Sequence, residues 1–256
     1  MNKFEFKNIE FYSKLNRIKY PYCWLNHTPI VKYIIKSIDP KKIVELGTHS
    51  GNSLITMLEA SGLDCKIYAV DTWEGDGHSK KYSIEIYNDL KEYISFYYPD
   101  NCELLRMRFD KAVNNFSDLS IDILHIDGYH TYDAVKYDFQ TYIPKVKKGG
   151  LVLFHDILVK EKDFGVYKFW KEIEDSFPHI TLRNGTGLGI MLNDNEPNIF
   201  FSDLKHNEEL LYLLNTIGDN LRYKHEIEHL ELNLKYFTKS RIIQFADKIR
   251  KLLFRG

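Results

Sequence analysis

The sequence predicts an α/β fold, in which a doubly wound, seven-stranded, mainly parallel sheet is followed by a helical C-terminal appendage. Short apolar runs alternate with segments of helical periodicity, which is the pattern of parallel strands joined by crossover helices. Glycine or aspartate directly follows several of these runs, as is typical of ligand-binding strand ends. After about residue 197 the strand pattern stops and a helical pattern of mixed charge replaces it.

Length and composition restrict the class of protein. The 256 residues, 44% hydrophobic and 28% charged, suit one large domain with a small appendage. Because 35 basic side chains nearly balance 36 acidic ones, no overall field attracts nucleic acid. No apolar run approaches the ~18 residues of a membrane span. The three cysteines form no CxxC pair, which indicates a reducing compartment. We therefore expect a cytoplasmic protein that binds no nucleic acid.

The first elements can be followed in chain order. Residues 1–40 form a helical entry segment, in which Thr28 is expected to cap a helix with Pro29 at its first position. Residues 42–46 then form the first strand, and a glycine-containing turn and a helix follow. Residues 67–70 form the second strand, which Asp71 closes. This order predicts a β–α–β unit.

The same alternation continues to the end of the predicted domain. Later strands are expected at residues 102–107, 121–126, 151–154, 180–183 and 190–192, with the last two forming an antiparallel hairpin. The run at 121–126 is almost continuously apolar, as in a strand buried on both faces. The helix before 151–154 is expected to stop at the KKGG of residues 147–150. The sheet domain therefore spans residues 41–196, and a helical extension spans 197–256.

The first two strand ends indicate a nucleotide-like ligand. The turn after the first strand, Glu45-Leu-Gly47-Thr-His-Ser-Gly51, lets the backbone approach a ligand but lacks the G-x-G-x-x-G of a dinucleotide site. Glu45 suits a positively charged ligand. Asp71 is placed to accept hydrogen bonds from a ribose diol. Together these features favour an adenosine cofactor without a pyrophosphate, and S-adenosylmethionine (SAM) fits that description.

Several blocks in the right order carry a family resemblance: WLNHTPI (24–30), VELGTHSGNS (44–53), YAVDTWEGDGH (68–78), residues 121–156, FGVYKFW (164–170) and GTGLGI (185–190). They resemble a bacterial family of class I, Rossmann-like SAM-dependent methyltransferases found beside or fused to surface-glycan glycosyltransferases. Macrocin-type and metal-dependent O-methyltransferases are more distant relatives. The resemblance implies a methyltransferase that uses SAM, and it does not reach the final sixty or so residues.

The resemblance also implies which residues bind the cofactor. The loop after the first strand would contact SAM through Glu45, Gly47, Thr48, Ser50 and Gly51. The ribose and adenine side would be formed by Asp71 and Trp73, with Asp110 near the adenine.

Polar side chains at the ends of the fourth and fifth strands point to the chemistry. Methyl transfer to an alcohol requires alignment of the reacting atoms and removal of one proton. His130 can act as a general base with Asp127 and His155 beside it, and we favour this mechanism. In the alternative mechanism, Asp127, His155 and Asp156 hold a divalent metal ion that lowers the acceptor's pKa. His125, inside the apolar run, is expected in the core.

These residues predict an O-methyltransferase of a sugar hydroxyl in bacterial surface-glycan biosynthesis. The alternatives are an enzyme for another small molecule, or a non-catalytic SAM-binding scaffold that docks a glycosyltransferase. Residues 239–256 are basic, with apolar residues on one face. This stretch either packs on the domain or on a second copy in a homo-oligomer, or it docks a glycosyltransferase or the inner face of the membrane.

Overall fold

The computed structural model describes residues 9–75, 77, 81–239, 245 and 248–250. The seven strands that it contains there are β1 (Lys42–Leu46), β2 (Lys66–Asp71), β3 (Cys102–Arg106), β4 (Ile121–Ile126), β5 (Val146–His155), β6 (His179–Leu182) and β7 (Leu188–Leu192). The longer helices are α2 (Thr28–Ile38), α3 (Asn52–Ala60), α4 (Ile84–Tyr97), α6 (Tyr132–Tyr142), α7 (Val166–Ile173), α8 (Ile199–His206) and α9 (Glu208–Lys239). The short helices are α1 (Ile9–Ser13) and α5 (Phe109–Ala112) and the 3-10 turns η2 (Cys23–His27), η3 (Val113–Asn115), η4 (Ile143–Lys145) and η5 (Glu174–Ser176).

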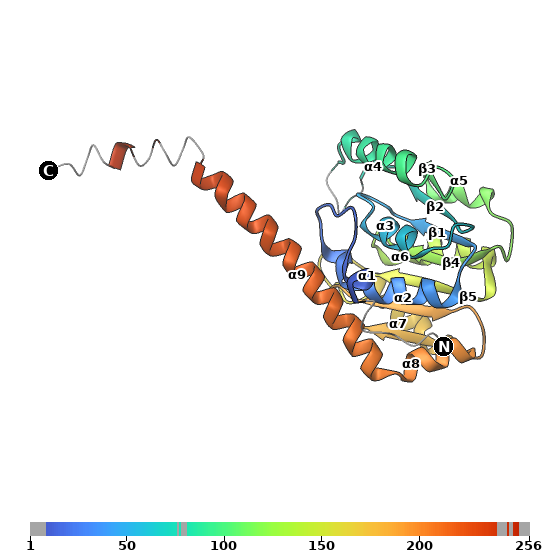
Figure 1. Cartoon of the computed structure of the whole chain (residues 1–256). Helices are drawn as coiled ribbons and strands as arrows, with labels where there is room; N and C mark the ends of the chain where they lie inside the picture. The colour runs from blue at the N-terminus through green and yellow to red at the C-terminus, as the bar shows by residue number, and fades with distance from the viewer. Residues whose placement is uncertain (1–8, 76, 78–80, 240–244, 246–247, 251–256) are drawn as a thin grey trace.

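The strands form one sheet in the order β3-β2-β1-β4-β5-β7-β6, with helices on both faces (Figure 1). The pairs among β1 to β5 are parallel, whereas β7 is antiparallel to both β5 and β6. The structure thus confirms the doubly wound, mainly parallel sheet and its closing antiparallel pair. Because the strand order reverses between β1 and β4, a crevice opens beyond the carboxyl ends of these two strands.

Alternate residues of the central strands enter two separate cores. In β1 and β4, Ile43 and Ile123 join the core beneath α2, α3 and α4, whereas Val44 and Leu124 join the core beneath α6 and α7. Side chains of a strand point to opposite faces, so a strand covered by helices on both sides is largely apolar. This explains why residues 42–46 and 121–126 could be predicted without error at either end.

Two local predictions were wrong. Thr28 is the first residue of α2 and His27 is its N-cap, because the Thr28 hydroxyl instead meets the Thr56 hydroxyl of α3 at 3.2 Å. The fifth strand is also longer than residues 151–154, since it begins at Val146. The KKGG stretch belongs to this strand, and Asn193 N donates to Gly150 O at 2.8 Å while Gly149 N donates to Asn193 O at 2.9 Å. Backbone pairing therefore extends the strand beyond its apolar part.

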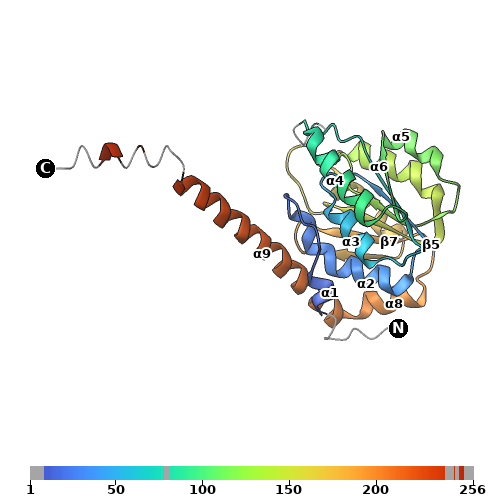
Figure 2. The same cartoon turned by 45° about the horizontal axis from the view of Figure 1, so that its top comes forward.

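The extension after the sheet is helical, as predicted. The first half of α9 buries Leu210, Leu214, Ile217 and Leu221 against the domain. The helix still meets the domain at His229, whose ring stacks on Tyr20 with the ring centroids 5.0 Å apart, and its later turns project away from the domain (Figures 1 and 2). Most of residues 239–256, for which a partner or membrane contact was predicted, lie outside the described residues. Within the described part of the chain, no helix has both the length and the apolar character of a membrane span.

Candidate active site

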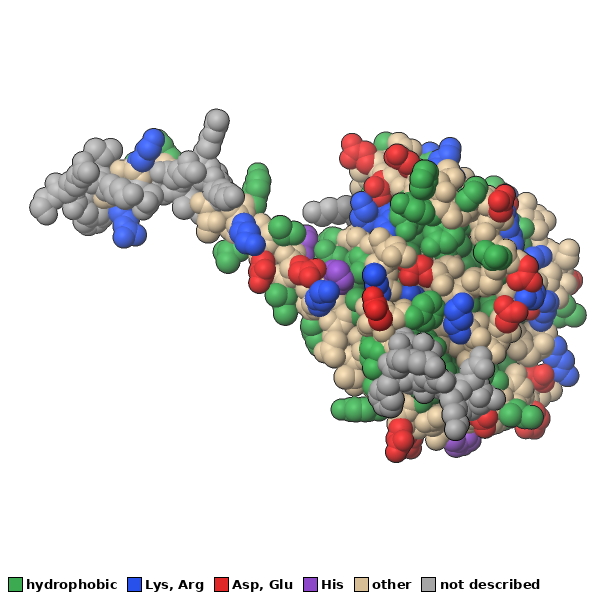
Figure 3. Space-filling view, viewed as in Figure 1, with side chains coloured by type: hydrophobic (Ala, Val, Ile, Leu, Met, Phe, Trp, Pro, Cys, Tyr) green, Lys and Arg blue, Asp and Glu red, His purple; other side chains and the backbone are tan. Residues whose placement is uncertain are grey.

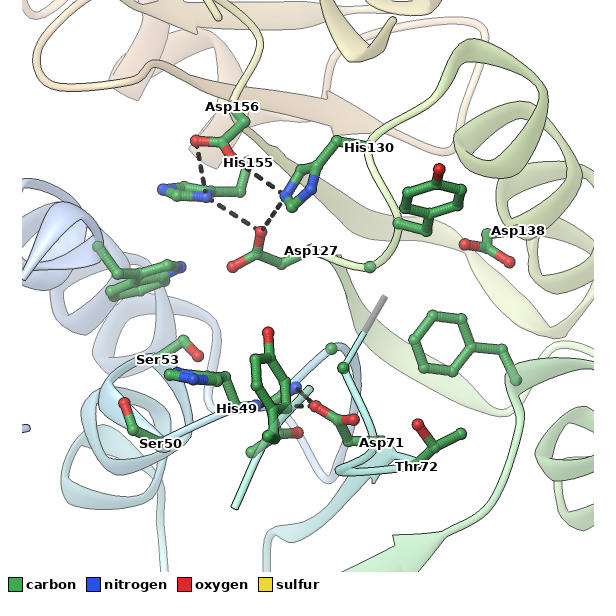
Figure 4. A pocket seen from close by; sticks show the side chains of 18 of the residues that line it. His49, Ser50, Ser53, Asp71, Thr72, Asp127, His130, Asp138, His155 and Asp156 are labelled. Atoms are coloured by element: carbon green, nitrogen blue, oxygen red, sulfur yellow. Dashed lines mark hydrogen bonds and ion pairs between the residues drawn. The ribbon is translucent and has the colours of Figure 1, made fainter. Parts of the chain in front are cut away.

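A cavity of about 990 Å³ lies beyond the carboxyl ends of the parallel strands. The loops that follow β1, β2, β3, β4 and β5 all contribute to its lining. Its size is near the upper end of the ~300–1,000 Å³ that small-molecule and cofactor sites occupy. Figure 4 shows two polar groups in it, one around Asp71 and His49 and the other around Asp127 and His130.

The glycine of the first loop permits a close approach of two backbones. Gly47 has a φ of +88°, and its N–H donates to Val70 O at 2.9 Å. A Cβ atom at this position would lie 2.0 Å from the carbonyl oxygen of Asp127. Since no side chain fits there, only glycine lets the loops after β1 and β4 meet. This contact brings the two polar groups of the cavity together.

Asp71 fixes the same loop from the next strand. One carboxylate oxygen accepts hydrogen bonds from the N–H groups of Thr48 at 3.0 Å and His49 at 2.9 Å, and the other accepts one from Trp73 N at 2.7 Å. Asp71 also lines the cavity. The carboxylate predicted to bind a ribose diol therefore also shapes the cofactor loop.

Of the predicted cofactor residues, Gly47, Thr48, Ser50, Asp71 and Asp110 line the cavity, but Glu45, Gly51 and Trp73 do not. Glu45 is fully buried within β1, where its carboxylate meets the His125 imidazole at 3.1 Å. Trp73 is buried, and its indole N–H donates to His49 O at 2.9 Å. These two side chains therefore support the site from behind instead of facing the cavity.

Gly51 supports the site in a different way. It is the N-cap of α3, with a φ of +88°. A Cβ there would meet Leu90 at 2.7 Å, so its role is to start the helix without a clash.

Two acids and two histidines form a compact cluster at the ends of β4 and β5 (Figure 4). His130 Nε2 lies 3.1 Å from Asp156 and 3.5 Å from Asp127. His155 Nδ1 lies 3.1 Å from Asp127 and 3.2 Å from Asp156. Asp156 has a φ of +60°, a strained conformation for a residue other than glycine. Each histidine therefore contacts both carboxylates.

The cluster is arranged to hold positive charge. Burial lowers the pKa of His130, but the adjacent carboxylates of Asp127 and Asp156 outweigh it and raise this pKa to about 10. For His155 the same two carboxylates overcome burial and raise the pKa to about 8. A general base should have a pKa near the working pH. The arrangement therefore argues against the role of His130 as a base at neutral pH.

Three of these residues could hold a metal ion. One ligand atom from each of Asp127, His130 and Asp156 lies within 4.8 Å of the other two. This set differs from the predicted one, because His130 takes the place of His155. The second ring nitrogen of His155 lies 3.2 Å from the Thr186 hydroxyl, so His155 braces the two carboxylates from the protein side. Two carboxylates with one imidazole suit a divalent ion such as Mn²⁺.

Asp138 is a residue of the cavity that was not predicted from the sequence. This α6 side chain lines the cavity although only 7% of it is exposed. Burial, with a smaller contribution from Asp110, raises the pKa of its carboxyl to about 7. Val135, Phe139 and Tyr142 of α6 are buried in the core, and Asp138 lies next to Phe139 on that buried side. The apolar pattern of α6 could have indicated this position, because Asp138 is next to the buried Phe139.

The cavity wall formed by η2 was also not identified. Trp24 lines the cavity, and its indole N–H donates to His125 Nε2 at 3.3 Å. On the far side of η2, Arg222 of α9 donates to the side-chain oxygen of Asn26 at 3.1 Å. Gly218 of α9 approaches so closely that a Cβ there would lie 1.9 Å from Asn26 O. The turn η2 is therefore held between the cavity and α9.

The residues around the first loop fit SAM. Among the described residues, the buried Thr48 hydroxyl has no hydrogen-bond partner, although Thr48 lines the cavity. A buried polar atom without a partner is costly, so a polar ligand at this position would be stabilising. Asp71 supplies an acceptor on the same side of the cavity for the hydroxyls of a ribose.

The fold and site together define a class of protein. Seven strands in this order, with a glycine turn after the first and an aspartate at the end of the second, are the arrangement of a class I SAM-dependent methyltransferase. Residues 44–157 match the family model described as "Methyltransferase domain". Residues 44–157 of this chain are therefore similar to a methyltransferase domain, within a sheet that has the class I strand order.

Two curated relatives are described as uncharacterized proteins. Over 217 residues the chain is 35% identical to the uncharacterized protein y4gI of Sinorhizobium fredii, a match that covers 82% of this chain and 22% of that protein. Over 123 residues it is 31% identical to an uncharacterized protein of Acanthamoeba polyphaga mimivirus, which covers 46% of this chain and 52% of that protein. The chain thus spans about a fifth and about half of these curated relatives.

Solved structures share the fold. A proposed caffeoyl-CoA O-methyltransferase from Staphylococcus aureus has a TM-score of 0.53 at 17% identity, over 73% of this chain and 89% of that one. A protein from Corynebacterium glutamicum has a TM-score of 0.50 at 15% identity, over 75% of this chain and 88% of that one.

Proposed function

We propose that this chain is a SAM-dependent O-methyltransferase in which Asp127, His130 and Asp156 hold a divalent cation at the acceptor hydroxyl. The observation that carries the proposal is the convergence of these three ligand atoms within 4.8 Å, in the same cavity as the loop after β1. When bound, the cation lowers the pKa of the hydroxyl, and SAM supplies the methyl group.

The chain's own residues position the reactants. The contact between Gly47 and the Asp127 backbone fixes the distance between cofactor loop and acidic cluster. Asp71 holds the loop in shape, and His155 holds the carboxylates of Asp127 and Asp156 in place. Such fixed spacing favours an in-line displacement, whose rate depends mainly on alignment.

We further propose that the acceptor is a sugar hydroxyl of a surface-glycan intermediate, methylated in the cytoplasm. The sequence blocks that resemble glycan-associated methyltransferases support this acceptor. The occurrence of the matching region within the much longer y4gI protein agrees with a domain that can be fused to others. A methyltransferase for another small molecule would have the same cofactor site, and only the acceptor would differ.

The test is transfer of tritiated methyl from SAM to a panel of sugars, with and without chelator. We expect chelation to abolish transfer and Mn²⁺ to restore it, and we expect Asp156→Asn and His130→Ala to lower transfer at least about a hundredfold, about 3 kcal/mol. S-adenosylhomocysteine (SAH) should still stabilise both variants in thermal unfolding.

Two outcomes would contradict the proposal. Transfer that survives both chelation and His130→Ala would refute the assignment of the metal site. Stabilisation by SAH without transfer to any acceptor would favour the non-catalytic scaffold instead.

A further inference from the structure

The projecting half of α9 exposes a stripe of large apolar side chains. They are Tyr223, Ile227, Leu230, Leu234 and Phe237, which are 56%, 57%, 65%, 64% and 61% exposed. We call these five residues the α9 stripe. Figure 3 shows hydrophobic side chains along this helix where it leaves the domain. Contiguous exposed apolar surface of this kind marks an interaction site.

The spacing of the stripe is that of a coiled coil. Its members follow one another at intervals of four, three, four and three residues, so they occupy the a and d positions of successive heptads. The residues by which α9 packs on the domain, Leu214, Ile217 and Leu221, belong to a different face of the helix. A helix can therefore pack along the α9 stripe without displacing the domain.

We infer that the α9 stripe pairs with the same stripe of a second copy of this chain, with the two helices antiparallel. The charges beside the stripe favour this orientation. Lys224 and Glu231 both occupy the e position of their heptads, and e positions face each other in an antiparallel pair. When Ile227 packs against the partner's Leu230, Lys224 therefore lies beside the partner's Glu231, and the same pair recurs at the other end. In a parallel pair, Glu226 would face the partner's Glu231, and like charges would repel.

The charges of this segment also favour a second copy of the chain over an anionic membrane surface as the partner of the α9 stripe. Between residues 222 and 238, three basic side chains (Arg222, Lys224, Lys235) accompany three acidic ones (Glu226, Glu228, Glu231). Helices that lie on anionic lipid carry an excess of lysine and arginine on their polar face. With no net attraction to lipid, this segment suits another helix of complementary charge.

The experiment measures the oligomeric state of the full chain by sedimentation and light scattering over a range of concentrations. We expect reversible dimers. Leu234→Asp should weaken the dimer at least tenfold, because it places a charge in the apolar seam. Leu232→Asp is the matched control, since Leu232 is equally exposed at 64% but lies outside the stripe. It should leave the dimer intact.

Orientation is tested by charge reversal. In the antiparallel pair, Lys224→Glu and Glu231→Lys should each weaken the dimer, and the double variant should restore it. In a parallel pair, Glu231→Lys would tighten the dimer, so that result would overturn the orientation. A wild-type chain that stays monomeric, or that instead floats with phosphatidylglycerol vesicles, would overturn the inference altogether.

Discussion

Asp138→Asn should make the protein more stable at neutral and alkaline pH. Asp138 is a buried acid of the cavity, and burial raises the pKa of its carboxyl to about 7, from 3.8 in an exposed state. The native state therefore favours the protonated form. Between these two values the unfolded chain releases a proton that the native chain retains, so stability falls as the pH rises. Asparagine resembles the protonated acid in shape and cannot ionise.

The magnitude follows from the shift in pKa. Each pH unit between about 4 and 7 removes about 1.4 kcal/mol from the wild type and nothing comparable from the variant. The difference in unfolding free energy should therefore be close to zero near pH 4 and approach about 4 kcal/mol above pH 7. It should not grow further at higher pH, because Asp138 is then ionised in both states.

Urea unfolding at several pH values from 5 to 8, followed by circular dichroism, measures this difference. Asp133→Asn is the control, because Asp133 is an exposed acid in the first turn of the same helix. A difference between Asp138→Asn and wild type that stays constant across this range would refute the reasoning. It would mean that Asp138 is ionised in the native protein at every pH tested.

Three further predictions concern the loops and the cluster. Gly47→Ala should destabilise the protein by at least about 2 kcal/mol in urea unfolding, because the added Cβ would clash with the Asp127 carbonyl. It should also abolish stabilisation by SAH, and normal SAH binding would contradict the proposed loop contact. Glu45→Gln should cost about 1–3 kcal/mol of stability but leave SAH affinity almost unchanged, because Glu45 pairs with His125 and does not line the cavity. A large loss of SAH affinity in calorimetry would instead indicate that Glu45 contacts the cofactor. Asp127→Asn should weaken Mn²⁺ binding at least about tenfold by calorimetry, and unchanged binding would exclude Asp127 from the metal site.

The fold could be predicted well because its signals are local. Strands covered on both faces are largely apolar along their length, and a glycine or aspartate marks where several of them end. The start of α2 and the length of β5 depend on contacts with distant residues, namely Thr56 and Asn193. Those partners are not visible in the neighbouring sequence, and both predictions failed for that reason.

The candidate site could be predicted in composition but less well in orientation. The positions of Asp127, His130, His155 and Asp156 at two strand ends indicated the cluster. Which histidine joins the metal ligands depends on where each ring points. His155 is the last residue of β5, and its ring reaches Thr186, whereas His130 comes from a loop. The burial of Asp138 likewise follows from how α6 packs, which periodicity suggests only indirectly.

The position of η2 has a consequence for defining the smallest fragment that keeps the cavity intact. The family match ends at residue 157, and the predicted boundary of the sheet domain lies at 196. Asn26, however, meets Gly218 and Arg222 of α9 directly behind the wall that Trp24 forms. A fragment shortened to the sheet alone would lose the α9 contacts that support that wall. The minimal unit for crystallography or enzymology therefore extends through at least Arg222.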